Sequence, residues 1–220
     1  MLSAAGSGEA TLPQPRSLVI VRHGRTVANA RGLLLGRADP PLDEVGEAQA
    51  AALAAAVASG RFGSVAAVVS SPLVRAQQTA GHVAAKLGLE VQTDERLIEI
   101  DYGEFEGTPV TDVPAATWRQ WQEDLHFRPP EGESLAELGR RVRECCEDWS
   151  VREPAGGAVV LVSHVSPIKA AVAWALGVDE AISWRAHLDT ASITRVLMRG
   201  DRPVLSLYND TSHVDTTRVT

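Results

Sequence analysis

The sequence predicts an α/β fold of three layers, in which helices cover both faces of a mostly parallel mixed sheet. Short, continuous apolar runs at residues 17–21, 65–69 and 159–162 are typical of strands that are buried on both faces. Each run is followed by a polar turn and an alanine-rich helical stretch, and this β-turn-α order favours parallel strands. Residues 193–198 and 203–208 are predicted to form an antiparallel hairpin, which makes the sheet mixed.

The helices are predicted from their first residues. A helix over residues 43–59 starts at an aspartate, a residue that caps helices, and its apolar positions recur at spacings of three and four. Serine followed by proline opens two more helices, at residues 71–72 and 166–167, because a proline at the first helical position loses no hydrogen bond. Ser134 begins a further helix that extends to Trp149.

One domain is expected over residues 17–210, between a disordered N-terminal tail at residues 1–16 and a C-terminal tail at residues 211–220. The apolar content of 45% and the charged content of 22% are close to the averages for a soluble globular protein. Residues 100–130 are the least regular part of the domain, with aromatic side chains set among polar ones. This segment forms either a lid over a site or a small satellite core, and the sequence leaves both open.

Charge and cysteine content narrow the classes of partner and compartment. The formal net charge of −7 leaves no broad basic surface, so nucleic-acid binding is not expected. Cys145 and Cys146 are adjacent in a helical stretch and cannot bridge one another without distortion, which favours a reducing, cytoplasmic setting. Residues 1–16 lack the features of a signal peptide, and no run reaches about 18 apolar residues, so we expect no membrane association. The oligomeric state stays open, with a homodimer as one option.

Polar and cationic residues follow the three predicted parallel strands, at residues 22–26, 70–75 and 163–164. Because ligands of open α/β sheets bind beyond the carboxyl ends of the strands, two histidines and up to three arginines are expected to meet in one crevice. Guanidinium groups match phosphate oxygens with two parallel hydrogen bonds, and helix N-termini offer backbone N–H groups to the same anion. The sequence therefore predicts a phosphate site, with no metal ligands among its residues.

Several motifs extend this prediction. Residues 22–29 (RHGRTVAN) resemble the R-H-G-x-T-x-x-N signature of the histidine phosphatase superfamily, which is also called phosphoglycerate mutase-like. Residues 39–50 resemble the D-x-P-L-x-x-x-G-x-x-Q-A element of that family, and residues 70–80 resemble its S-x-L-x-R-A-x-x-T-A element. Residues 132–134 (GES) resemble the start of a later family helix. The resemblance implies the phosphoglycerate mutase-like form of the predicted α/β/α sandwich.

The resemblance implies that His23 attacks phosphorus and becomes a phosphohistidine. It also implies that three side chains hold the phosphoryl oxygens: Arg22, Arg75 and His164. A neutral imidazole can attack without metal activation, and the cationic cluster stabilises the charge on the transferred group. Asn29 and Thr26 are also candidates for phosphate binding, with capping of the turn after His23 as their alternative role.

Glu99 aligns with the general acid of the family, which gives a proton to the leaving alkoxide. Asp101 is the next candidate, and the family pattern places Glu106 in a structural role. The sequence departs from the pattern where His164 is followed by Val165 rather than glycine.

The function expected from these residues is metal-independent hydrolysis of a small phosphorylated metabolite, without a cofactor and with inorganic phosphate as product. A cofactor-dependent phosphoglycerate mutase is the first alternative. Mutases of this type have a longer, strongly basic insertion, whereas residues 100–130 here contain only Arg119 and Arg128 as basic residues. A catalytically silent module that binds a phosphorylated ligand is the second alternative.

Overall fold

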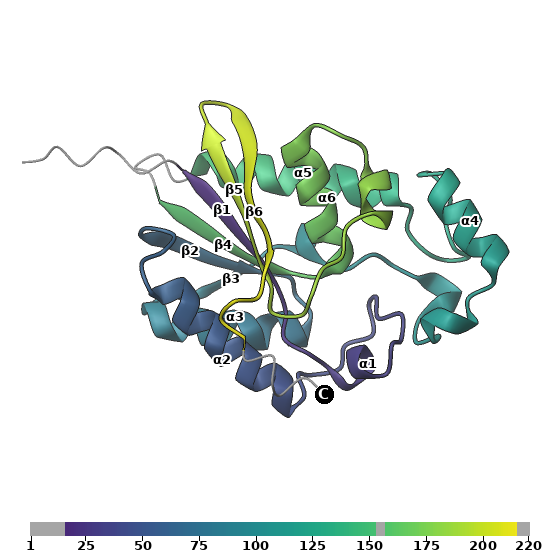
Figure 1. The fold of residues 1–220 in the computed structure, drawn as a ribbon, viewed down its shortest axis with the longest axis horizontal. Coiled ribbons are helices and arrows are strands. Elements are labelled where there is room, and N and C mark those ends of the chain that lie inside the picture. Colours follow the sequence, from purple (N-terminus) through teal and green to yellow (C-terminus); the bar gives the residue numbers. More distant parts are fainter. Residues whose placement is uncertain (1–15, 153–156, 215–220) are drawn as a thin grey trace, which may run out of the picture.

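A mixed sheet lies at the centre of the computed structural model, which describes residues 16–152 and 157–214 (Figure 1). Its strands in the described residues are β1 (Ser17–Arg22), β2 (Val65–Ser70), β3 (Val91–Thr93), β4 (Ala158–Ser163), β5 (Ile193–Arg199) and β6 (Arg202–Asp210). The strand order is β3-β2-β4-β1-β5-β6. The first four strands in this order are parallel, whereas β5 and β6 run antiparallel as a hairpin, so the predicted mixed sheet is confirmed.

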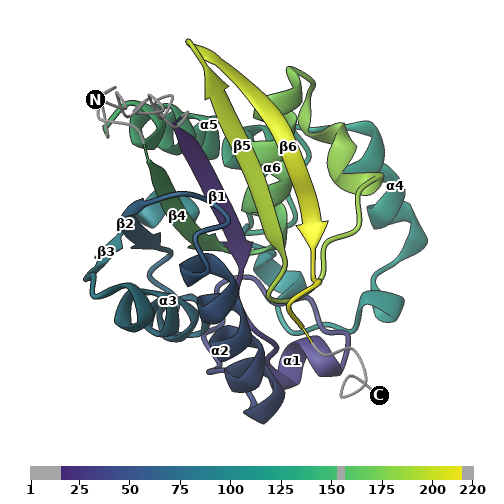
Figure 2. The same ribbon diagram turned by 60° about the vertical axis from the view of Figure 1, so that its left-hand side comes forward.

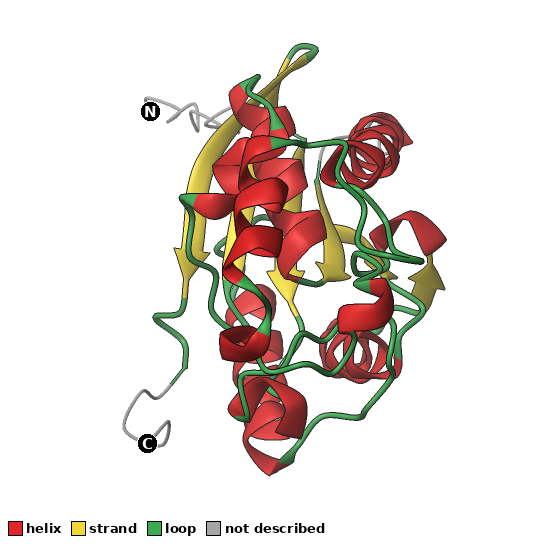
Figure 3. Cartoon of the chain, turned by 90° about the vertical axis from the view of Figure 1, so that its right-hand side faces the viewer, coloured by secondary structure: helices red, strands yellow, loops and turns green. Residues whose placement is uncertain are grey.

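Helices cover both faces of this sheet. The α-helices of the described residues are α1 (Val27–Ala30), α2 (Glu44–Ala58), α3 (Val74–Leu87), α4 (Ala115–Glu123), α5 (Leu135–Arg152) and α6 (Val165–Leu176). Helices α2 and α3 lie on one face and α5 and α6 on the other, which can be followed by their labels in Figure 2, and Figure 3 shows the strands and helices by colour from a further direction. The three-layer α/β/α architecture predicted from the sequence is therefore confirmed.

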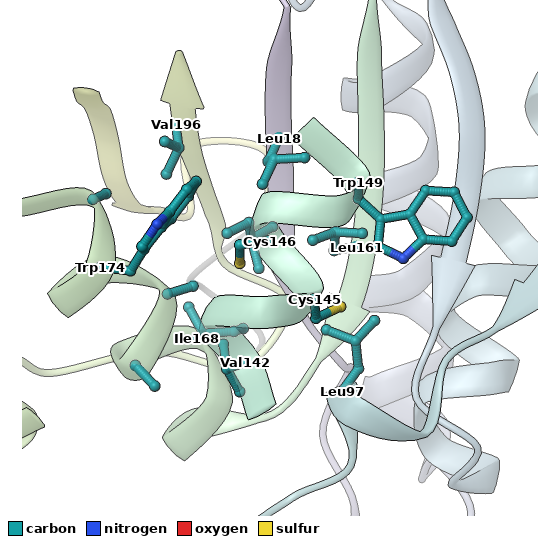
Figure 4. Packing of buried hydrophobic residues seen from close by; sticks show 14 of the residues in the cluster. Leu18, Leu97, Val142, Cys145, Cys146, Trp149, Leu161, Ile168, Trp174 and Val196 are labelled. Carbon is teal, nitrogen blue, oxygen red and sulfur yellow. The ribbon is translucent and has the colours of Figure 1, made fainter. Parts of the chain in front are cut away.

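Alternate residues of the central strands pack against opposite helix layers. Leu18 and Ile20 of β1 contact the layer of α5 and α6, whereas Val19 and Val21 contact the layer of α2 and α3. This arrangement follows from the two-residue period of a strand, and it explains why these strands are continuously apolar. Figure 4 shows the first cluster, in which the buried thiol-bearing residues 145–146 also lie. Both cysteines are free, and burial raises the pKa of each thiol.

Helix α3 begins later than predicted. The Ser-Pro pair at residues 71–72 does not open it, because the helix starts at Val74. The carboxylate of Asp39, from a distant loop, accepts a hydrogen bond from the Val74 amide at 2.7 Å and so caps the helix. Ser71 is thereby left to contact the side chain of His164, at 2.7 Å between Oγ and Nε2.

Helix α6 begins earlier than predicted, at Val165, with His164 as its N-cap. Pro167 is therefore the third helical residue rather than the first. The proline is tolerated there because the first N–H groups of a helix have no partner within the helix. By contrast, Ser134 caps α5 as predicted, since its hydroxyl accepts from the Glu137 amide at 3.3 Å.

The irregular segment at residues 100–130 forms a satellite core around α4. Trp121 is fully buried, and it lies 5.5 Å from Trp118 and 5.8 Å from Tyr102 between ring centroids. Trp118 also packs edge-on against Trp184, which comes from a distant part of the chain, at 5.9 Å. The helix α4 and the short elements α1 and β3 were not predicted from the sequence. Each is too short to show a clear hydrophobic period.

The predicted tails at residues 1–16 and 211–220 fall largely outside the described residues. Within the part of the chain that the structure describes, none of the helices has the length and apolar character that crossing a membrane requires.

Candidate active site

The pairing of the central strands brings the two histidines together. Arg22, the last residue of β1, pairs in register with Ser163, the last residue of β4. His23 and His164 follow directly, and their ring centroids lie 5.0 Å apart. Ser70 ends β2 beside β4, so all three polar strand ends meet at one edge of the sheet.

The ring of His23 is held in one tautomer. Its Nδ1 lies 2.7 Å from the carbonyl oxygen of Gly24. Because a carbonyl oxygen can only accept, Nδ1 carries the hydrogen and Nε2 keeps its lone pair. Burial lowers the pKa of His23 well below its usual value, and the nearby cations Arg22 and Arg75 lower it further. His23 is therefore neutral near pH 7, with a free nucleophilic nitrogen.

Residues of the family-like motifs hold the loop after His23 in place. The amide of Gly24 donates to Oγ1 of Thr79 at 3.1 Å, and the amide of Arg25 donates to Oε1 of Gln49 at 2.8 Å. The backbone of Gly24 passes so close to Gly46 that a Cβ on Gly24 would lie 2.4 Å from the Gly46 carbonyl oxygen. Helices α2 and α3, which lie on the same face of the sheet, thus hold the loop that positions the imidazole.

Two arginines flank the histidines with their guanidinium groups anchored to backbone carbonyls. The side chain of Arg75 is fully buried and donates to the carbonyl oxygens of Gly36 and Ala38, both at 2.7 Å. Arg22 donates to the carbonyl oxygen of Leu188 at 2.6 Å. Among the described residues, Nε of each arginine is buried without a partner. Burial lowers the pKa of Arg22 to about 10, so it stays a cation at neutral pH.

Glu106 positions the loop that holds Arg75. Its carboxylate accepts from the amides of Gly36 and Arg37, each at 2.9 Å. This segment supplies the carbonyl oxygens to which Arg75 donates. The contacts give Glu106 a structural task, in agreement with the role that the family pattern implies.

Glu99 is a buried carboxyl group at the same site. It accepts hydrogen bonds from the amides of Ile100 at 2.8 Å and Ser166 at 3.2 Å. Burial raises the pKa of Glu99, and these hydrogen bonds only partly oppose that shift. The rival Asp101 is instead bonded to the amide of Gly103 at 2.9 Å and paired with Arg37.

A cavity of about 90 Å³, whose lining does not include Arg75 or His164, lies against His23, and we call it the strand-end pocket. Its lining includes Arg22, His23, Asn29, Glu99, Tyr102 and Val165. A space of this size holds several water molecules or one group of similar bulk. Among the described residues, no three His, Cys, Asp or Glu side chains are grouped closely enough to hold a metal ion.

Asn29 and Thr26 have different positions. The amide of Thr26 donates to Oδ1 of Asn29 at 3.0 Å, and the amide of Asn29 donates to Oγ1 of Thr26 at 3.2 Å. Thr26 thus caps α1 and does not line the strand-end pocket. Asn29 does line it, and Nδ2 is its available donor because Oδ1 accepts in the cap.

The sequence matches a known protein family over most of its length. The family model of the histidine phosphatase superfamily (branch 1) matches residues 18–211. The chain belongs to this superfamily. The chain is 39% identical over 183 residues to a protein of Mycobacterium tuberculosis named as bifunctional, covering 82% of this chain and 50% of that protein. The chain therefore spans about half the length of the mycobacterial relatives that it matches.

Other relatives are matched over nearly their full length. A probable phosphoglycerate mutase of Yersinia enterocolitica is 36% identical, with 89% of this chain and 94% of that protein covered. A mycobacterial glucosyl-3-phosphoglycerate phosphatase in complex with VO3 is similar in structure, with a TM-score of 0.79 and 31% identity over 89% of this chain and 100% of that chain. A mutant phosphoserine phosphatase of Entamoeba histolytica in complex with phosphoserine is also similar in structure. Its TM-score is 0.82 and its sequence identity is 27%, with 91% of this chain and 100% of that chain covered.

Two residues of this site were not predicted from the sequence to have a role in it. Ser71 was predicted to open a helix, but it contacts His164 and also accepts from the Leu73 amide at 3.4 Å. Its hydroxyl hydrogen is therefore free to point to Nε2, which leaves Nδ1 of His164 as a donor without a partner among the described residues. Its position after the second strand was the signal that could have identified it.

Arg141 is the second such residue. It donates to the carbonyl oxygens of Ile98 at 2.7 Å and Glu99 at 3.2 Å, and its guanidinium also pairs with Glu133 at 2.7 Å. Glu133 belongs to the GES motif, so this motif holds the backbone of Glu99 through Arg141. The contact spans 42 residues, and no local pattern predicts it.

Proposed function

We propose that this chain is a metal-independent phosphomonoesterase that hydrolyses a small phosphorylated metabolite through a phosphohistidine on His23. One observation carries the proposal. The Gly24 carbonyl holds His23 in the tautomer that exposes a neutral Nε2, beside the half-buried Arg22, the buried Arg75 and a buried glutamic acid. The names of two phosphatases of similar structure give glucosyl-3-phosphoglycerate and phosphoserine as their substrates. Both are small phosphorylated molecules, and this supports the same class of substrate here.

In the first step, Nε2 of His23 attacks phosphorus and the bond to the ester oxygen breaks. Arg22 and Arg75 donate to the non-bridging oxygens and stabilise the charge on the transferred group. Nδ1 of His164 and Nδ2 of Asn29 are further donors. We assign Thr26 to holding Asn29 in place rather than to direct contact with phosphate.

Glu99 gives its proton to the leaving alkoxide in this step. Its raised pKa keeps part of the population protonated above the usual range of a glutamate. The resulting carboxylate then takes a proton from a water molecule, which attacks the phosphohistidine and releases inorganic phosphate. No step needs a metal, because the nucleophile is already unprotonated and the arginines supply the positive charge.

The test of the proposal is a chromogenic assay. The purified protein should release nitrophenolate from p-nitrophenyl phosphate, and the rate should be the same with and without excess chelator. Silencing by chelator and recovery with a divalent ion would contradict metal independence. Absence of turnover with this ester and with a panel of sugar phosphates and phosphoglycerates would instead support the silent binding module.

Substitution of lysine for Arg75 should slow turnover by roughly 30- to 1000-fold, which corresponds to a loss of about 2–4 kcal/mol of transition-state stabilisation. An ammonium group cannot reproduce the planar fork that reaches the Gly36 and Ala38 carbonyls and phosphate together. Steady-state kinetics of Arg75→Lys should be compared with Arg31→Lys, a substitution at an exposed position. Near-normal turnover of Arg75→Lys would assign the residue a purely structural role.

The mutase alternative is supported by the name of the Yersinia relative. Arg119 is exposed and Arg128 pairs with Glu137, so the basic residues of the 100–130 segment do not line the strand-end pocket. The proposal therefore favours hydrolysis. Incubation with 3-phosphoglycerate and catalytic 2,3-bisphosphoglycerate decides between them, because a mutase would form 2-phosphoglycerate faster than inorganic phosphate.

A further inference from the structure

A second cavity of about 90 Å³, which we call the tryptophan pocket, lies beside the strand-end pocket. The two pockets share Tyr102 and Val165 in their linings. The other residues used below are Trp118, Lys169, Ser183 and Trp184. A ligand larger than a phosphate group that occupied the strand-end pocket would extend past Val165 into this space.

Lys169 connects the tryptophan pocket to the site chemistry. It lies one turn after Val165 on α6, on the same side of the helix. Its charge interacts with the carboxyl of Glu99 strongly enough to affect the pKa of the lysine, although burial lowers that pKa overall. A leaving group that extends from Glu99 past Val165 would therefore enter the pocket that Lys169 lines.

The tryptophan pocket contains polar groups that can donate further hydrogen bonds. Nζ of Lys169 donates one hydrogen bond, to the carbonyl oxygen of Ser183 at 2.8 Å, and has no carboxylate within ion-pair distance among the described residues. Nε1 of Trp184 and Oγ of Ser183 are buried and lack partners within the described part of the chain. Buried donors are usually satisfied, so this set indicates that an acceptor binds here.

A carboxylate matches this donor set better than a second phosphate. One ammonium group balances a single negative charge, and two carboxylate oxygens can accept from several N–H and O–H donors. A phosphate dianion would leave excess negative charge in a pocket with indole walls, next to a carboxyl group. The faces of Trp118 and Trp184 suit the carbon skeleton that joins the two anionic groups.

We propose that the tryptophan pocket binds the leaving group and that Lys169 selects phosphoesters of hydroxycarboxylates. The inference rests on the proposed phosphatase function and names its substrate class. It assigns Lys169 a role in specificity, since the lysine contacts the part of the substrate that leaves.

The test compares 3-phosphoglycerate with glycerol 1-phosphate, in which a hydroxymethyl group replaces the carboxylate. The wild type should have the higher kcat/KM for 3-phosphoglycerate. Lys169→Met should lower the ratio of the two kcat/KM values by about 10- to 100-fold, the range expected for loss of a hydrogen bond to a charged group. Lys169→Arg should retain most of the preference. The matched control is Lys86→Met, which removes the other lysine of the chain from an exposed position on α3.

Each outcome has a defined meaning. An unchanged ratio in Lys169→Met, or a wild type without preference, overturns the inference while hydrolysis of p-nitrophenyl phosphate still supports the phosphatase function. If no ester is hydrolysed, the phosphatase function fails, and calorimetric titration with 3-phosphoglycerate tests the pocket directly. Binding that weakens about 10-fold or more in Lys169→Met but not in Lys86→Met supports the carboxylate site. Equal binding by all three proteins overturns it.

Discussion

Replacement of His23 by alanine should abolish turnover and leave the fold intact. The imidazole is the proposed nucleophile, and no other side chain of the strand-end pocket offers an unprotonated nitrogen. Among the described residues, the hydrogen bond of the ring is to the carbonyl of the adjacent Gly24, so its loss should change the thermal unfolding midpoint little. Phosphate release from p-nitrophenyl phosphate and a circular dichroism melting curve measure the two effects.

The matched control is His82→Ala. His82 lies on α3 and pairs with Glu47 of α2 at 2.8 Å, away from the pocket, so this variant should keep its activity. A labelled substrate should also transfer its phosphate to the wild type in an alkali-stable, acid-labile form. Normal turnover of His23→Ala, or label on a serine or cysteine, would show that His23 is not the nucleophile.

Replacement of Glu99 by glutamine should slow hydrolysis of an alkyl phosphate by about 100- to 10,000-fold, the usual contribution of a positioned general acid. Nitrophenolate departs readily without a proton, so hydrolysis of p-nitrophenyl phosphate should fall much less. Steady-state kinetics with both esters measure this difference. Asp101→Asn is the matched control, because Asp101 is bonded within its own turn and paired with Arg37.

The same two groups predict the pH profile. Activity requires a neutral His23, whose pKa is lowered, and a protonated Glu99, whose pKa is raised. The acid limb therefore reports protonation of His23 and the alkaline limb reports ionisation of Glu99. An unperturbed glutamate titrates near pH ~4.3, and both burial and a bound phosphate dianion move this limb upward. Hydrolysis of the alkyl ester should peak on the acidic side of neutrality.

The pH profile of Glu99→Gln decides this assignment. The alkaline limb should disappear in this variant with the alkyl ester, because glutamine does not ionise. If the limb persists, or if both esters slow equally, Glu99 is not the general acid and Asp101 becomes the candidate to test by the same substitution.

The fold was predictable because its signals are local. A continuous apolar run shows that a strand is buried on both faces, and the order of strands and helices favours a parallel sheet. Residues 193–198 and 203–208 were also recognisable as strands from their local sequence. The starts of α3 and α6 were not, because the carboxylates of Asp39 and Glu99, which are distant in the chain, accept from amides in the first turns of these helices.

The sequence by itself determined which side chains stand at the strand ends, and with them the predicted phosphate chemistry of residues 22–23, Arg75 and His164. Only the tertiary structure decided how these groups are held. The tautomer of His23 depends on the loop geometry at Gly24, and the position of the Glu99 backbone depends on the hydrogen bond from Arg141. The tertiary structure also places Lys169 in the lining of a pocket next to the site. The Gly24 loop is itself held by Thr79, and Arg141 reaches Glu99 across 42 residues, so these arrangements depend on residues distant in the chain and leave no periodic or local pattern in the sequence.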